Sequence, residues 1–198
     1  GGCEPVGRSG PRRAVGETRV WGSGTAPRLA VNVSARELLE PDFVAWLAGA
    51  LGDNAVSFDR ITIEVTETAF VRDLGTSART VAALRDAGAT IALDDFGTGY
   101  SSLTYLREFP IDEVKVDRSF VRELDGPDAD DSIVSMVLNL ARSLGVEVVA
   151  EGIETDGQLD AFRALGGHLA QGFLLGRPDR FEVLSGERAA GARSAPNR

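Results

Sequence analysis

Cysteine and histidine are almost absent from the sequence, since each occurs once among 198 residues. Because Cys3 has no cysteine partner, an internal disulfide framework and a cysteine-based zinc site are both excluded. His168 has no second histidine, which leaves a histidine-based metal site and a Ser-His-Asp triad with little support. We interpret Cys3 as incidental, His168 as structural, and the low cysteine content as typical of a reducing compartment.

Long apolar runs are also missing. The longest apolar stretches, such as 133–140, are interrupted by polar residues well short of the roughly 20 apolar residues that a membrane-spanning helix needs. Residues 1–13 lack the apolar stretch of a secretory signal, and the chain begins with Gly rather than Met. We therefore expect a cytoplasmic fragment of a longer protein, with no membrane segment.

Negative charge dominates, with a formal net charge of −9 at pH 7. Residues 1–28 carry an excess of arginine over acidic residues, so the acidity belongs to the rest of the chain. Such a surface repels DNA, and a phosphate ligand would have to be held by metal ions or local basic groups. We expect three segments, namely an irregular one at 1–28, one folded domain at 29–184 and a disordered tail at 185–198.

Six short runs rich in β-branched residues alternate with segments of helical period. These predicted strands are LAVN (29–32), ITIEVTE (61–67), TIALDD (90–95), EVKVD (113–117), VEVVAE (146–151) and HLAQGF (168–173). Alternating strands and helices are typical of an α/β protein with a parallel sheet and right-handed crossovers.

Helix signals lie between these runs. The segment 132–145 has apolar residues at helical spacing and ends at Gly145, so it predicts a helix that packs on the sheet through Ile133, Met136, Val137, Leu140 and Leu144. Another helix is predicted to start at a capping box formed by Thr155 and Gln158. Gly88 and Gly166 are predicted to end two more helices.

A polar residue lies at or near the end of every predicted strand. An open doubly wound sheet concentrates its ligand groups at one switch point, whereas a barrel collects them from many strand ends. The pattern therefore favours a TIM-like (β/α) barrel. A complete barrel has eight strands and typically about 250 residues, so we expect an incomplete barrel with about six of the eight strands. The strand-end residues are Asn32, Glu64, Asp94, Asp95, Lys115, Glu151 and Gln171.

If these strand ends meet, four carboxylates and one amide oxygen form an oxygen-rich pocket. Carboxylates this close repel one another, and hard divalent cations such as Mg²⁺ or Mn²⁺ would neutralise them. Two metal ions bridged by a carboxylate are a recurrent arrangement for cleaving phosphodiesters. Lys115 would add a cation that orients a water or a phosphate oxygen.

Each residue also has a simpler interpretation when it is taken alone. Glu64 alternates with apolar residues and fits a solvent-facing strand position, and Lys115 fits a solvated edge lysine. Asn32 fits a cap on the following turn. The adjacent Asp94 and Asp95, followed by Gly97 and Gly99, are more typical of a catalytic or ligand loop. The joint placement at strand ends favours a shared site.

Several segments resemble the signature segments of EAL domains. They are VNVSAR (31–36), EVTET (64–68), LDDFGTGYSSL (93–103), KVDRSFV (115–121), VVAEGIET (148–155) and QGF (171–173). The resemblance covers about residues 29–178. It implies a metal-dependent phosphodiesterase of cyclic-di-GMP signalling, which hydrolyses cyclic-di-GMP to pGpG with two Mg²⁺ or Mn²⁺ ions.

The resemblance also implies residue roles. Asn32, Glu64 and Asp94 would hold one metal ion, while Asp94 would bridge to a second ion held by Asp95 and Glu151. Lys115 would contact the attacking water, and Glu151 would also act as the catalytic base. The resemblance also implies that Glu154 supports the lysine and that Gln171 holds a water near the metals. Glu67 would anchor the loop 96–102.

The same resemblance implies a homodimer formed through the 96–102 loop region, and a fused or partner sensor or diguanylate cyclase domain. The Glu-Ala-Leu segment that names the family does not occur in the sequence, and we expect it upstream of residue 1. Two further hypotheses remain open. One is a catalytically inactive cyclic-di-GMP receptor or protein-interaction module, and the other is an enolase-type metal-dependent barrel, which does not explain LDDFGTGYSSL.

The absent tripeptide leads to a first prediction. The chain should form pGpG far more slowly than a version carrying a complete N-terminal part of the family, because removal of one electrostatic contributor commonly costs about 10²–10³ in rate. Chromatography of the products with Mn²⁺ present measures both rates. Equal turnover by the two proteins would contradict this expectation.

Overall fold

The computed structural model describes residues 28–71, 73–97, 106, 109–126 and 132–177. In these ranges six strands form one sheet, and neighbouring strands are parallel throughout. The strands are β1 Leu29–Asn32, β2 Ile61–Thr66, β3 Thr90–Phe96, β4 Glu113–Val116, β5 Glu147–Glu151 and β6 Leu169–Gln171. All six predicted strands are therefore confirmed, with small differences at their ends.

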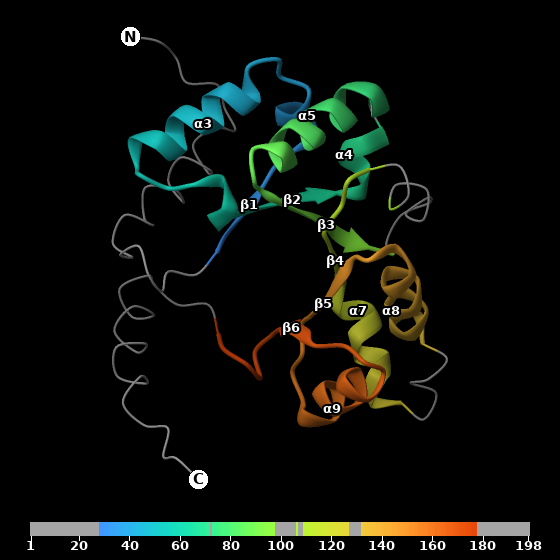
Figure 1. The fold of residues 1–198 in the computed structure, drawn as a ribbon. Helices are drawn as coiled ribbons and strands as arrows, with labels where there is room; N and C mark the ends of the chain where they lie inside the picture. The colour runs from blue at the N-terminus through green and yellow to red at the C-terminus, as the bar shows by residue number, and fades with distance from the viewer. Residues whose placement is uncertain (1–27, 72, 98–105, 107–108, 127–131, 178–198) are drawn as a thin grey trace, which may run out of the picture.

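The order of the strands along the sheet is the same as their order along the chain, from β1 to β6. A doubly wound sheet reverses its order at a switch point, and this sheet has no such reversal. Figure 1 shows the strands along a curved path with the helices on its outer side. The described residues thus form a six-stranded, curled part of a (β/α) barrel, which confirms the predicted fold class.

Helices connect the strands, and most begin at a side-chain cap. Ser132, Thr155, Asp73 and Asp117 each accept a hydrogen bond from a backbone N–H in the first turn of the helix that follows. The predicted capping box of Thr155 and Gln158 is confirmed. The helices are α2 Ala35–Leu38, α3 Phe43–Asp53, α4 Glu67–Val71, α5 Leu74–Asp86, α7 Arg118–Val121, α8 Ile133–Leu144 and α9 Asp156–Ala164, with 3-10 turns η2 Phe58–Arg60 and η3 Arg122–Asp125.

Glycine ends three of these helices for a clear conformational reason. Gly145 follows α8 with φ of 71° and Gly166 follows α9 with φ of 89°, a region that L side chains rarely adopt. Gly88 follows α5 in the same way with φ of 107°, so the predicted stops at Gly88, Gly145 and Gly166 are all confirmed. None of the helices in the described residues is long and apolar enough to cross a membrane.

The core lies between the sheet and its outer helices. In β2 the side chains of Ile61, Ile63 and Val65 alternate with Thr62 and Glu64, and all five residues are buried. Because side chains alternate along a strand, the apolar set faces the helices and the polar set faces the inner side of the curved sheet. This alternation carries Glu64 to the inner side, away from the helix layer.

The face of α8 that packs on the core differs from the predicted face. Val134, Val137, Leu138 and Ala141 are buried, whereas Met136 is 63% exposed and Leu144 is 38% exposed. The prediction of a buried Met136 and Leu144 is wrong. Both stripes are apolar and have the i, i+3, i+4, i+7 spacing of a helix face, so packing against the rest of the protein decides which of them is buried.

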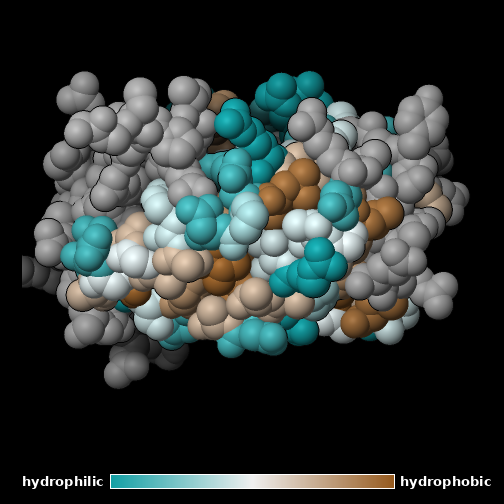
Figure 2. All heavy atoms as spheres, turned by 90° about the horizontal axis from the view of Figure 1, so that it is seen from above, coloured by the Kyte–Doolittle hydropathy of each residue, from teal (hydrophilic) through white to brown (hydrophobic). Residues whose placement is uncertain are grey.

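The outer surface carries scattered apolar residues of the same kind. Figure 2 looks down on the molecule from above, the side on which Figure 1 shows α3 and α5. On this face hydrophobic residues lie among hydrophilic and neutral ones. Single exposed apolar side chains are ordinary on protein surfaces, so the exposure of Met136 calls for no special role.

Two substitutions on α8 test which face is buried. Leu138→Ala removes a buried side chain and should lower the free energy of unfolding by about 2–5 kcal/mol. Met136→Ala removes an exposed one and should change it by no more than about 0.5 kcal/mol. Urea unfolding followed by circular dichroism measures both values. A larger loss for Met136→Ala than for Leu138→Ala would show that the observed helix face is wrong.

Candidate metal centre

The carboxyl ends of the six parallel strands meet at one rim of the curved sheet. Asn32 ends β1 and lies opposite Glu64 of β2, while Glu151 ends β5 and lies opposite Gln171 of β6. Lys115 lies in β4, between β3 and β5. The predicted strand-end residues therefore share one rim, as in barrels whose sites form at this end.

A break in the register of β3 explains how two adjacent aspartates serve one site. Neighbouring side chains of a regular strand point to opposite faces. The pairing of β3 with β4 shifts between Leu93 and Phe96, and Asp95 has φ of 54°. A bulge of this kind redirects a side chain, and aspartate tolerates a positive φ better than most residues. Asp94 and Asp95 can thus face the same space.

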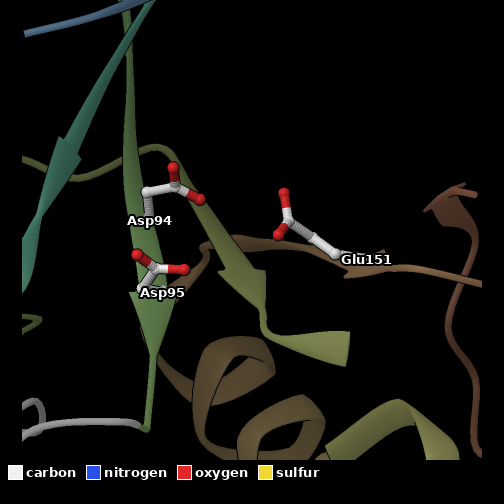
Figure 3. A group of neighbouring side chains, drawn as sticks. All are labelled: Asp94, Asp95 and Glu151. Carbon is white, nitrogen blue, oxygen red and sulfur yellow. The ribbon is translucent and has the colours of Figure 1, made fainter. Parts of the chain in front are cut away.

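Three carboxylates gather there, from Asp94 and Asp95 of β3 and Glu151 of β5. One oxygen from each lies within 4.8 Å of the others. Figure 3 shows the carboxylates of Asp94 and Glu151 turned toward one another, with Asp95 beside them. Oxygen ligands at such spacing suit a hard divalent cation.

The ammonium group of Lys115 lies among carboxylates of three neighbouring strands. Its Nζ is 2.9 Å from Glu64 Oε1, 3.0 Å from Asp94 Oδ1 and 2.7 Å from Glu151 Oε1. Lys115 is 7% exposed and Glu64 is 8% exposed. Neither the solvated edge lysine nor the solvent-facing Glu64 that the sequence allowed is therefore correct.

Burial and charge oppose each other in this cluster. Burial by itself lowers the pKa of Lys115, but its close pairing with the carboxylates of Glu151, Glu64 and Asp94 outweighs burial and raises that pKa above its ordinary value. Burial raises the pKa of Glu151, and the nearby Asp94 and Glu64 raise it further while Lys115 opposes them. The lysine stays charged, and Glu151 is a stronger base than an exposed glutamate.

Asp95 lies at the more exposed side of the cluster. Burial raises its pKa, and the negative charges of Asp94 and Asp117 add to that effect. A divalent cation would relieve this repulsion, because an opposite charge favours the ionised carboxylate.

One oxygen of Asp94 has spare capacity to bind a cation. Asp94 Oδ1 is buried, and no described group donates a correctly directed hydrogen bond to it, although Lys115 Nζ is 3.0 Å away. A buried carboxylate oxygen without a hydrogen-bond partner is unfavourable. The residues present therefore fit a divalent metal ion.

A cavity of about 650 Å³ lies beside the cluster. Glu151 belongs to the cluster and lines the cavity, and Gln171, another lining residue, donates a hydrogen bond of 2.6 Å from its Nε2 to Glu151 Oε1. The other lining residues are Asp117, Arg118, Gly152, Glu154, Gly172, Phe173, Gly176 and Arg177. The cavity is thus an extension of the metal centre and not a separate site.

Two arginines and an aromatic ring in this cavity had no predicted role. The guanidinium carbon of Arg177 lies 4.9 Å from the centre of the Phe173 ring, and Phe173 is 53% exposed. Arg118 packs against Gly152, where a Cβ atom would come within 2.5 Å of the arginine side chain. In the sequence, Arg118 directly follows KVD (115–117) and Arg177 lies four residues after QGF (171–173). These positions could have drawn attention to the two arginines, but only the fold brings them to one cavity.

The remaining predicted residues lie at the edges of the centre. Glu67 is buried at the start of α4. Asn32 and Glu154 are exposed, and Glu154 lines the cavity. Most of the 96–102 loop lies outside the described residues, so its predicted contact with Glu67 and its place in a dimer stay predictions.

The sequence matches the family model described as EAL domain over residues 12–178. The bifunctional diguanylate cyclase/cyclic di-GMP phosphodiesterase MucR of Pseudomonas aeruginosa is 40% identical over 170 residues, which are 85% of this chain and 25% of that protein. The chain spans about a quarter of the length of the curated relatives that it matches.

Solved structures give the same result. The EAL domain of Mycobacterium smegmatis DcpA is 37% identical with a TM-score of 0.84, covering 91% of this chain and 82% of that one. The manganese and cyclic-di-GMP complex of Klebsiella pneumoniae BlrP1 is 37% identical with a TM-score of 0.73, covering 83% of this chain and 42% of that one.

Replacing the buried lysine tests the balance of charge. Lys115→Met leaves Glu64, Asp94 and Glu151 without their shared cation, and should lower the free energy of unfolding by about 3–5 kcal/mol. Mn²⁺ should then raise the melting temperature more in the variant than in the unaltered chain. Differential scanning fluorimetry with and without Mn²⁺ measures this.

The matched control is Arg85→Met, which removes the more exposed ion pair of Arg85 with Asp112. Its effect should stay near or below about 1 kcal/mol. If both variants lose the same stability and gain the same from Mn²⁺, Lys115 does not neutralise the cluster.

Proposed function

Because the chain belongs to the EAL domain family, we propose that it hydrolyses cyclic-di-GMP to the linear dinucleotide pGpG. The observation that supports this most directly is the convergence of Asp94, Asp95 and Glu151 around Lys115 at one rim of the sheet. Clustered carboxylates with a buried cation are suited to divalent metal ions and to a charged phosphodiester.

We propose two Mg²⁺ or Mn²⁺ ions. Asn32, Glu64 and Asp94 would hold one ion, and Asp95 and Glu151 the other, with Asp94 shared between them. Bound ions would neutralise the carboxylates and the charge that develops on the phosphate. The buried Oδ1 of Asp94, which receives no correctly directed hydrogen bond from the described residues, and the manganese in the BlrP1 complex support this part of the proposal.

Glu151 is the proposed general base. A water oxygen attacks the phosphorus while its proton passes to Glu151, the bond from phosphorus to the ribose oxygen breaks, and that oxygen takes a proton from solvent. The raised pKa of Glu151 suits this task, because a carboxylate with a raised pKa is a stronger base. Lys115 would orient the water and hold the negative charge of the phosphate beside it.

The supporting roles that the family resemblance implies complete the proposal. Gln171 donates to Glu151 and would fix both that carboxylate and a nearby water. Glu154 lines the cavity and would assist Lys115, and Glu67 would anchor the 96–102 loop.

The cavity suits an anionic dinucleotide. Arg118 and Arg177 bring positive charge to its wall, and Phe173 offers an exposed ring on which a base can stack. The chain as a whole carries a net negative charge, so local basic groups such as these arginines are needed to hold a phosphate ligand.

The other predicted properties stay part of the proposal. They are the domain bounds 29–184, a homodimer through the 96–102 region, a fused or partner sensor or diguanylate cyclase domain, and a cytoplasmic location. MucR carries both a diguanylate cyclase and a phosphodiesterase in its name, which supports the fused arrangement.

Manganese titration by calorimetry tests the metal centre. Asp94→Asn and Asp95→Asn each remove one anionic ligand, so each should weaken Mn²⁺ binding at least about tenfold. Asp160→Asn is the matched control, because Asp160 is exposed and pairs only with Arg163 in the described structure. Unchanged affinity in Asp94→Asn would show that the metal assignment is wrong.

Nucleotide binding separates the enzyme from the receptor hypothesis. For a phosphodiesterase centre, binding of cyclic-di-GMP should depend on Mn²⁺ or Ca²⁺ and should weaken in Asp94→Asn. A catalytically inactive receptor predicts binding that is the same after the metal is chelated. Titrations with and without a chelator distinguish the two outcomes.

A further inference from the structure

Asp125, at the end of η3, contacts the first turn of α9. Its Oδ1 accepts a hydrogen bond from Thr155 Oγ1 at 3.0 Å, and its Oδ2 accepts one from Gln158 Nε2 at 2.9 Å. Thr155 and Gln158 are the two side chains of the capping box. One carboxylate thus joins the turn that follows β4 to the helix that follows β5.

These contacts fix the direction of every hydrogen bond in the capping box. An ionised carboxylate only accepts, so the hydroxyl proton of Thr155 points to Asp125 and its oxygen is left to accept from the N–H of Gln158 at 3.1 Å. The amide nitrogen of Gln158 also faces Asp125, which turns its Oε1 toward the N–H groups of Glu154 at 2.8 Å and Thr155 at 3.2 Å. If the side-chain amide of Gln158 were reversed, its oxygen would face the carboxylate of Asp125, and neither group could donate a hydrogen bond to the other.

The backbone fixed in this way forms one wall of the cavity. Gly152 and Glu154 both line the cavity. Ile153 lies between them, and its N–H donates to Gln171 O at 3.0 Å while its carbonyl accepts from the Leu174 N–H at 3.1 Å. The segment 152–155 is therefore held by β6 on one side and by Gln158 on the other.

We propose that Asp125 is a positioning residue for this cavity, acting through Thr155 and Gln158 on the backbone of Glu154. The inference rests on the proposed function of the same site. Asp125 touches neither the carboxylate cluster nor the cavity, so its effect passes through the orientation of the Gln158 amide.

The glycine at position 157 gives independent support for the contact between Asp125 and the capping box. It lies in the first turn of α9, where glycine is a poorer helix residue than alanine. A Cβ atom at this position would lie 2.9 Å from Asp125 Oδ1. The missing side chain leaves room for the carboxylate to approach the capping box.

A double-variant cycle tests the proposal. Asp125→Asn removes one acceptor, and Gln158→Glu places two carboxylates face to face, so each should speed hydrogen exchange of the Glu154 amide about tenfold. With both changes, the amide introduced at position 125 donates to the carboxylate introduced at position 158. This hydrogen bond runs in the opposite direction to the original one, and exchange should return to within about threefold of the unaltered chain. Nuclear magnetic resonance of the full chain measures this amide.

The same proteins are titrated with cyclic-di-GMP in Ca²⁺ and separately with Mn²⁺. Each single variant should bind the nucleotide about tenfold more weakly, the double variant should recover, and Mn²⁺ affinity should stay the same in all. Gly157→Ala should behave like Asp125→Asn even though alanine favours helix, whereas Gly49→Ala on α3, which has open space around it, is the control.

Exchange at Glu154 that is unchanged in the single variants, or not recovered in the double variant, overturns the proposal. Faster exchange with unchanged nucleotide affinity overturns it too, because the cavity would then not depend on this backbone. If the unaltered chain binds Mn²⁺ but no cyclic-di-GMP, the proposed function fails instead, and the exchange cycle still decides whether Asp125 holds the segment.

Discussion

The ammonium group of Lys115, enclosed by carboxylates of Glu64, Asp94 and Glu151, is the interaction on which the centre depends. These acidic groups come from strands on both sides of β4, so their mutual repulsion would push the strand ends apart if no cation lay between them. One buried lysine holds them together at hydrogen-bonding distance. The same closeness leaves a carboxylate pocket that suits divalent ions.

Local backbone irregularity shapes the centre as much as charge does. The register shift in β3 and the positive φ of Asp95 bring two consecutive residues to one side of the sheet. Gly152, directly after Glu151, lets the side chain of Arg118 pack close to the backbone, and Gly172 lets the backbone pass close to that of Ile153. A glycine after each of these two strand ends therefore permits close packing in the wall of the cavity.

Sequence patterns predicted the strands well, because each buried strand is a short run of β-branched residues between polar positions. The shared rim for Glu64, Lys115 and Glu151 followed from the same repeat, since parallel strands end at one side. Burial of Glu64 did not follow, because alternation on one strand is equally compatible with a solvent-facing side. The face of α8 was predicted incorrectly, since its two apolar stripes overlap and only contact with the sheet selects between them. Long-range contacts such as Asp125 with Gln158 leave no local pattern at all.

Sequential strand order also bears on how such a chain is made. In the described sheet every strand after β1 pairs with the strand before it, as Ile61 does with Leu29 and Leu169 with Val149, so the pairing joins segments that are near in sequence. Such topology lets each βα unit dock on the previous one while a ribosome is still extending the chain. Glu151 and Gln171 enter after the other residues of the cluster. A nascent chain that has emerged only through β4 therefore already carries Glu64, Asp94 and Lys115, and it gains Glu151 and Gln171 only when β5 and β6 follow.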